Sequence, residues 1–225
     1  MHDIHILQEG KAKFYASQDR GGKISKDLEV FYNPAMKFNR DVTILLLNSM
    51  SSLKMVDDLQ MADIMAGSGV RSLRFMLELD SDLAITSLNV NDKMEGFAEL
   101  FKKNLELNKE ELENNEKNGY VIFNKEKLII TEDDANEMLV TSRGFDFIDI
   151  DPFGSPNDFL DNAITRVSRK GILAITGTDT APLSGTYPDA CERNYWGVPL
   201  KTGMMHEVGL RILIRKVQLI GGQHE

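Results

Sequence analysis

Residues 145–156, FDFIDIDPFGSP, form the stretch that decides the fold. The first six positions have the aromatic and β-branched content of a short buried strand, contributed by Phe145, Phe147, Ile148 and Ile150. Pro152 cannot donate a backbone hydrogen bond to a neighbouring strand, so the strand is expected to end there, and the glycine and proline that follow predict a tight loop. We therefore expect Asp151, Pro152 and Phe153 to project together from the end of a strand.

These three residues bring together a carboxylate, a backbone carbonyl and an aromatic ring. Such a group suits a planar ring that carries an exocyclic amine. The ring would stack on Phe153, and the amine would donate its two N–H groups to Asp151 and to the carbonyl of Pro152.

Strands and helices alternate on both sides of this stretch. Strands are expected around 61–65 and at 84–90, 127–131, 145–150 and 171–176, and helices near 70–79, 95–107, 135–140, 157–168 and 204–220. This alternation predicts an α/β fold with a doubly wound, mainly parallel sheet. In such sheets the functional groups lie at the carboxyl ends of the strands.

The N-terminal part is less regular. Short alternating segments within residues 1–30 predict edge strands of an extension, with DRGGK at 19–23 as a turn. A helix is expected from Pro34 to about Ser49, with its apolar residues on and around one face: Met36, Val42, Ile44, Leu45, Leu46 and Leu47. Residues 108–119 are interpreted as a charged linker. We expect an extension over 1–32 and a core over 33–225.

Four polar strand ends are expected to meet at one edge of the sheet. They are AGSG at 66–69, Asn91 with Asp92, residues 133–135, and Asp151 with the loop after it. An acidic residue about 20 positions after a glycine turn is typical of a pocket that holds a ribose by its hydroxyls. The AGSG turn lacks the full dinucleotide fingerprint and a phosphate-binding lysine, which favours an adenosine without a pyrophosphate. We assign the backbone of Gly67 and Gly69 to this pocket, Asp92 to the ribose, and Asp134 and Ala135 to the adenine. The alternative is that the carboxylates only cap helices.

Two arginines are candidate partners for an anion. Arg71 lies in the first turn of a helix, where a cation opposes the helix dipole at a cost of about 0.3–1 kcal/mol, and a bound carboxylate would offset that cost. Arg40 precedes the sheet and is a candidate for the same anion. Its alternative role is a surface salt bridge.

Composition limits the other classes of function. The net charge is −9, but residues 1–40 and 166–225 each carry more basic than acidic side chains, so a basic face for a nucleic acid remains open. The single cysteine excludes a disulfide within the chain, and the four histidines lack metal-ligand spacing, so no metal is expected. Apolar runs far shorter than about 20 residues and the absence of a signal peptide predict a cytoplasmic protein without a membrane span. Trp196 is expected in the core.

Several motifs in one order resemble the tRNA guanine-N2 dimethyltransferase family, which modifies guanosine 26. They are NPAMKFNRD, GSGVRSLR, NVNDK, DDAN, DPFGSP, TGTDTAPLSG and MMHEVGLRIL. The resemblance implies a class I, Rossmann-like methyltransferase that uses S-adenosylmethionine and acts on tRNA. Arg40 and Arg71 would bind the methionyl carboxylate, Asp92 the ribose, and Asp134 with Ala135 the adenine. Asp151, Pro152 and Phe153 would hold the guanine.

Members of that family continue beyond the final helix into two more strands and a C-terminal domain, so the resemblance implies that the last strands are missing. Two alternatives remain open. The first is an amino methyltransferase acting on adenine or cytosine, since such enzymes use a related acid and proline loop before an aromatic residue. The second is a non-catalytic module that binds RNA or a protein through an unpaired sheet edge.

Overall fold

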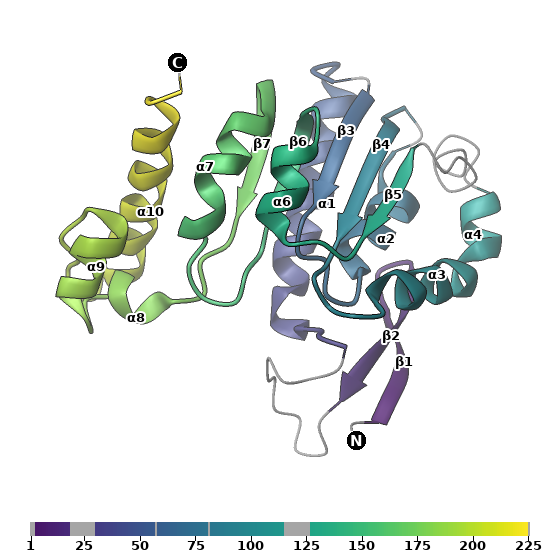
Figure 1. The fold of residues 1–225 in the computed structure, drawn as a ribbon, viewed down its shortest axis with the longest axis horizontal. Helices are drawn as coiled ribbons and strands as arrows, with labels where there is room; N and C mark the ends of the chain where they lie inside the picture. The colour runs from purple at the N-terminus through teal and green to yellow at the C-terminus, as the bar shows by residue number, and fades with distance from the viewer. Residues whose placement is uncertain (1–2, 19–29, 57, 81, 115–126, 225) are drawn as a thin grey trace.

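A five-stranded parallel sheet forms the centre of the molecule (Figure 1). The computed structural model describes residues 3–18, 30–56, 58–80, 82–114 and 127–224. In spatial order the strands are β5 (Leu128–Thr131), β4 (Ala84–Asn91), β3 (Asp58–Asp63), β6 (Phe145–Ile150) and β7 (Val167–Ile175). The expected α/β class, with a mainly parallel sheet, is confirmed.

Helices cover both faces of the sheet, because alternate strand residues point to opposite sides. Met61 and Phe147 pack on the side of α1 (Lys37–Ser52), α2 (Val70–Glu78) and α3 (Phe97–Leu107). Ala62 and Ile148 pack on the side of α6 (Ala135–Thr141), α7 (Asn157–Arg166) and α10 (Met205–Gly221). Figure 1 shows α10 beyond α7, at the β7 end of the sheet.

The N-terminal residues form an antiparallel hairpin of β1 (Asp3–Glu9) and β2 (Ala12–Gln18). It packs on α2 and α3 near the carboxyl ends of the strands (Figure 1). Ala12, Phe14 and Ala16 are fully buried in the main hydrophobic cluster, so the hairpin shares the core of the sheet. The turn expected at 19–23 lies outside the described residues.

The expected apolar face of α1 is confirmed for Leu47, which is fully buried, but wrong for Val42, Leu45 and Leu46. Its buried residues are Arg40, Thr43, Leu47 and Ser51. Leu45 is 67% exposed, and Val42 and Leu46 are also exposed. The helix follows the short 3-10 turn η1 (Pro34–Met36) and ends at Ser52, three residues later than expected. Its inner face is mixed: Leu47 packs in the main hydrophobic cluster, whereas Arg40 contacts the buried carboxylate of Glu9.

Other boundaries also differ from the sequence expectation. α7 ends earlier than expected, and β7 begins earlier, at Val167. The first part of β7 is irregular, and Lys170 there has a φ of 68°. A short helix α4 (Lys109–Glu113) lies within the expected linker and buries Leu112. Two further helices were also not predicted: α8 (Thr180–Leu183) and α9 (Pro188–Tyr195).

Trp196 is 47% exposed, with the Lys216 amine 3.0 Å from the centre of its ring, so its assignment to the core is wrong. Its neighbour Tyr195 is the buried aromatic residue instead. In the described ranges, no helix is long and apolar enough to cross a membrane.

Candidate active site

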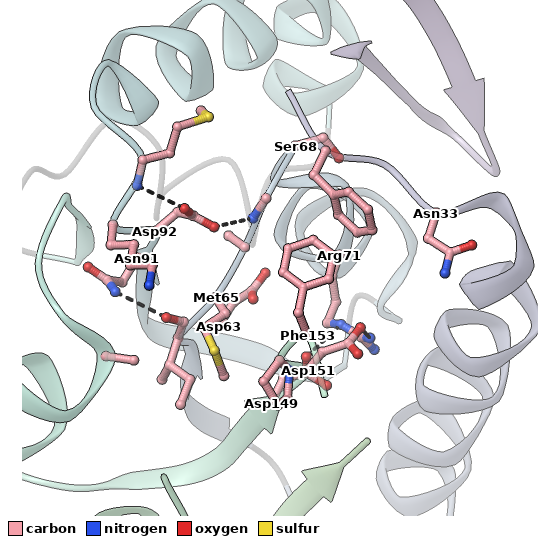
Figure 2. Close-up of a pocket in the computed structure, with 18 of the residues that line it drawn as sticks. Asn33, Asp63, Met65, Ser68, Arg71, Asn91, Asp92, Asp149, Asp151 and Phe153 are labelled. Atoms are coloured by element: carbon pink, nitrogen blue, oxygen red, sulfur yellow. Dashed lines mark hydrogen bonds and ion pairs between the residues drawn. The ribbon is translucent and has the colours of Figure 1, made fainter. Parts of the chain in front are cut away.

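A cavity of about 760 Å³ lies at the carboxyl ends of β3, β4 and β6. Its lining joins the four strand ends that the sequence analysis expected to meet. Figure 2 shows Asn91 and Asp92 on one side, Asp63 and Met65 in the middle, and Arg71, Asp149, Asp151 and Phe153 on the other. Arg40, Gly67, Asp134, Ala135 and Pro152 also line it.

Asp92 fixes the first turn of the cavity. Its Oδ2 accepts the backbone N–H of Gly67 at 2.7 Å, and its Oδ1 accepts that of Met94 at 3.0 Å (Figure 2). Gly67 has a φ of 56°, and a Cβ there would lie 3.1 Å from the backbone oxygen of Phe31. A carboxylate has about four acceptor positions, so Asp92 retains capacity for further donors.

Asp134 is the N-cap of α6, where Oδ1 accepts the backbone N–H of Asn136 at 2.9 Å. The capping role considered as an alternative is therefore present. It engages one oxygen and leaves Oδ2 available at the cavity wall.

Gly69 does not line the cavity with Gly67. It precedes α2 with a φ of 75°, and a Cβ there would lie 2.3 Å from Cδ2 of Phe101. This glycine is required for the close approach of the turn to α3. Both glycines were assigned to the pocket from the sequence, but only Gly67 lines it, whereas Gly69 has a packing role.

Arg71 lies at the centre of the acidic side of the cavity. Its Nε is 2.8 Å from Oδ2 of Asp149, and its Nη2 donates to Oδ2 of Asp151 at 3.1 Å and to Oδ1 of Asn39 at 3.0 Å. Its Nη1 is buried and has no hydrogen-bond partner among the described residues. An unpaired buried donor costs about 1–3 kcal/mol, so this atom indicates a site for an acceptor.

Two buried carboxylates lie beside this arginine. Asp63 and Asp149 are register partners on β3 and β6, and each is 2% exposed. Burial raises the pKa of Asp63 to about 6 and that of Asp149 to about 8, although the Arg71 charge acts in the opposite direction. The neighbouring carboxylates add to the rise. These two carboxylates therefore keep their protons to higher pH than exposed aspartates do.

Arg40 is also buried rather than a surface residue. Glu9 accepts its Nε at 2.7 Å and its Nη2 at 2.6 Å, and the Asn33 backbone oxygen also accepts Nη2. Within the described part of the chain, Nη1 of Arg40 donates no hydrogen bond. Among the same residues, Nη1 of Arg71 is buried without a hydrogen-bond partner. Both arginines line the same cavity.

The three residues after β6 differ in exposure. The Asp151 side chain is 21% exposed and Phe153 is 58% exposed, whereas Pro152 is buried. All three nevertheless line the cavity together, as expected. The Phe153 ring meets the edge of Phe31 at a centroid distance of 4.4 Å.

The segment after β7 holds the loop that follows Pro152. The Thr178 hydroxyl accepts the backbone N–H of Gly154 at 2.7 Å, and the Thr178 N–H donates to the Gly154 oxygen at 2.9 Å. The hydroxyl of Tyr195 is hydrogen-bonded to Ser155 and to Asp179. The loop that carries Phe153 is thus held in place by hydrogen bonds to Thr178 and Tyr195.

Comparison with known proteins decides the family. A family model described as N2,N2-dimethylguanosine tRNA methyltransferase matches residues 10–224. The chain belongs to this family. It is 43% identical to the tRNA (guanine(26)-N(2))-dimethyltransferase of Pyrococcus abyssi, with 100% of this chain and 56% of the relative covered. A relative from Aquifex aeolicus, named as a dimethyltransferase of guanines 26 and 27, is 38% identical over 99% of this chain and 53% of its own length.

A solved structure of this family, Trm1 from Pyrococcus horikoshii with S-adenosyl-L-methionine, superposes with a TM-score of 0.77 at 36% identity. The comparison covers 98% of this chain and 55% of that one. The chain spans about half the length of the curated relatives it matches.

Within this fold, several residues at or beside the cavity were not predicted from the sequence, and four of them bear on its charge or its aromatic surface. Asp63, Asp149 and Phe31 line it, and Glu9 holds Arg40. The strand-end aspartates were visible as polar positions in apolar strands. Glu9 had no such signal, because its partners are distant in sequence. In the described ranges no group of three potential ligands for a metal was found.

Proposed function

We propose that the chain transfers methyl groups from S-adenosylmethionine to the N2 amine of guanosine 26 in tRNA, giving N2-methylguanosine and N2,N2-dimethylguanosine. The observation that carries this proposal is the position of Arg71 in the cavity. Its Nη1 has no partner among the described residues, while its Nη2 contacts Asp151. One side chain can therefore link a bound carboxylate to the residue assigned to the amine.

The residues around the cavity fit S-adenosylmethionine. The Nη1 atoms of Arg40 and Arg71, which donate to none of the described residues, are suited to its methionyl carboxylate. The remaining acceptor positions of Asp92 suit the ribose hydroxyls, and Oδ2 of Asp134 with the backbone of Ala135 suits the adenine. Gly67 lies in the cavity wall and allows close contact with the Phe31 backbone, whereas Gly69 acts through the fold. When bound, the cofactor supplies an electrophilic methyl group on a sulfonium.

The guanine would lie at the other side of the cavity. A base in a folded tRNA is stacked, so it must be turned out to reach a pocket. The exposed Phe153 ring, with Phe31 beside it, offers the aromatic surface on which such a base can stack. Asp151 and the Pro152 carbonyl would then accept the two N–H groups of the amine.

The N2 amine of guanine is a weak nucleophile, and residues of the chain can orient it. The N2 lone pair is delocalised into the guanine ring, so the amine must be oriented as the new carbon bond forms. Arg71 engages Oδ2 of Asp151, which leaves Oδ1 to accept the amine proton. After the first transfer, the partly exposed Asp151 must release its proton to solvent and a second S-adenosylmethionine must bind. The remaining N–H can then donate to Asp151 in the second transfer.

Nucleoside analysis tests this proposal. The chain is incubated with unmodified tRNA transcript and labelled S-adenosylmethionine, and the digested tRNA is analysed by mass. Mono- and dimethylguanosine at position 26 are expected, and a transcript with adenosine at that position serves as the control. Methylated adenosine or cytidine would instead indicate another amino methyltransferase. Binding of the cofactor with no methylation would indicate a non-catalytic module.

The partner in this proposal is tRNA, as the family description implies. A cytoplasmic location follows from that choice of substrate. The support is the chemistry of the cavity together with family membership.

A further inference from the structure

Glu9, at the end of β1, is a carboxylate on which three residues from other elements converge. It is 2% exposed. It accepts two hydrogen bonds from Arg40 on α1, one from Nη1 of Arg74 on α2 at 2.8 Å, and one from the hydroxyl of Tyr32 at 2.9 Å. Arg40 and Tyr32 line the cavity, whereas Glu9 lies behind them.

The hairpin places Glu9 independently of these partners. Gly10 turns the chain with a φ of 57°, and the next backbone N–H, from Lys11, donates to Oε1 of Glu78 on α2 at 2.8 Å. β2 then buries Phe14 in the main core. The carboxylate is thus fixed by backbone and core contacts, so it can determine where the arginines lie.

Arg40 is held along one edge. Glu9 accepts Nε and Nη2, the two-bond arrangement that fixes the plane of a guanidinium. Nη1 remains unpaired in the described residues. We propose that Glu9 is a positioning residue for the cofactor site, which holds Arg40 so that Nη1 is directed to the cofactor carboxylate. This inference rests on the role of Arg40 in the proposed function.

Two simpler roles for Glu9 make different predictions. If Glu9 only neutralised the charge of Arg40, its removal would leave a stronger cation and tighten binding of a carboxylate. If it only stabilised the fold, its removal would lower stability and leave the affinity of the folded protein unchanged. Burial raises the pKa of Glu9, but its bonds to Arg40, Tyr32 and Arg74 and the Arg40 charge outweigh this, so the pKa lies below its usual value. Glu9 therefore acts as a charged acceptor.

Calorimetric titration with S-adenosylmethionine separates these roles. Glu9→Gln should weaken binding by the folded protein roughly tenfold, because the amide cannot accept both Arg40 donors. Glu78→Gln is the matched control, since Glu78 also binds Arg74 but contacts neither Arg40 nor Tyr32. It should bind like the wild type. Thermal unfolding of each variant shows that binding is measured on folded protein.

A double-variant comparison completes the test. Arg40→Met should weaken binding, and Glu9→Gln should then cause no further loss in the Arg40→Met background. Unchanged or tighter binding by Glu9→Gln, or an equal loss in both backgrounds, would overturn the inference while leaving the proposed function intact. If Arg40→Met bound S-adenosylmethionine as tightly as the wild type, the inference about Glu9 would be overturned. The roles of Arg71 and Asp151 in the proposed function would still stand to be tested. A wild-type chain that does not bind the cofactor would overturn the proposed function itself.

Discussion

Nη2 of Arg71, on α2, lies 3.1 Å from Oδ2 of Asp151, just beyond the end of β6. The same guanidinium contacts Asp149 through Nε, and its Nη1 has no hydrogen-bond partner in the described ranges. Arg71 is thus engaged at two of its three nitrogens, with the third open to a ligand. This geometry connects the residue proposed to anchor the cofactor with the residue proposed to accept the amine proton.

Arg71→Lys should impair both cofactor binding and methyl transfer. A lysine amine is a single point charge and cannot replace three separate nitrogens in a fixed plane. We expect affinity for S-adenosylmethionine to fall about tenfold and kcat to fall as well. Titration calorimetry and steady-state kinetics measure the two effects. Arg166→Lys, outside the cavity, is the control. If Arg71→Lys changed the KM for S-adenosylmethionine but left kcat unchanged, the contact between Arg71 and Asp151 would be unimportant for the transfer.

Gly69→Ala should destabilise the fold more than Gly96→Ala. Both glycines have positive φ values, 75° and 82°, so both variants carry backbone strain. A Cβ at Gly69 would also lie 2.3 Å from the Phe101 ring, whereas none of the described atoms lies within 4 Å of a Cβ at Gly96. Overpacking of this kind adds about 1–3 kcal/mol to the loss in the free energy of unfolding. Urea denaturation measures the difference, and equal losses would contradict the packing role of Gly69.

The stability of the unliganded protein should fall as pH rises through neutrality. Unfolded aspartates release their protons near pH 3.9, whereas burial raises the pKa of Asp63 to about 6 and that of Asp149 to about 8. Between the unfolded pKa near 3.9 and the raised folded pKa values, the folded state therefore binds more protons than the unfolded state. The stability that these bound protons contribute is lost as pH rises towards about 8.

Asp149→Asn keeps an oxygen for Arg71 and removes the titrating group with the higher pKa. The fall in the free energy of unfolding between about pH 6 and about pH 8.5 should be smaller than in the wild type. Urea denaturation at several pH values measures both slopes. Equal slopes in the two proteins would show that Asp149 does not titrate in this range.

Much of the fold followed from local patterns. Strand 145–150 matches β6, and the strand at 84–90 matches β4 to within one residue. These are short apolar strands with clear ends, so tertiary contacts did not need to override local preference. β7 began earlier than expected because a positive φ at Lys170 lets the irregular segment before Gly171 continue the strand.

The polar contents of the site were harder to predict. The meeting of the strand ends followed from topology, which brought Asp92 and Asp151 to one cavity. The polar part of the inner face of α1 was missed, because its buried Arg40 is held by Glu9, 31 residues earlier. Periodicity of apolar residues contains no information about a buried ion pair between distant elements. Such pairs appear only when the elements are placed together.

Substitution of Asp151 tests the central claim, that this carboxylate serves the transfer rather than the binding of the cofactor. Asp151→Asn keeps an acceptor for Arg71 but cannot take up the amine proton. Asp158→Asn, at another cavity residue that is exposed, is the matched control.

The direct measurement is single-turnover methylation of guanosine 26 in unmodified tRNA, with cofactor affinity determined by calorimetry on the same proteins. We predict that Asp151→Asn lowers the rate at least about 100-fold and leaves the affinity for S-adenosylmethionine close to that of the wild type. Asp158→Asn should retain both. A wild-type rate in Asp151→Asn, or a loss of cofactor binding that accounts for the whole decrease in rate, would contradict the account.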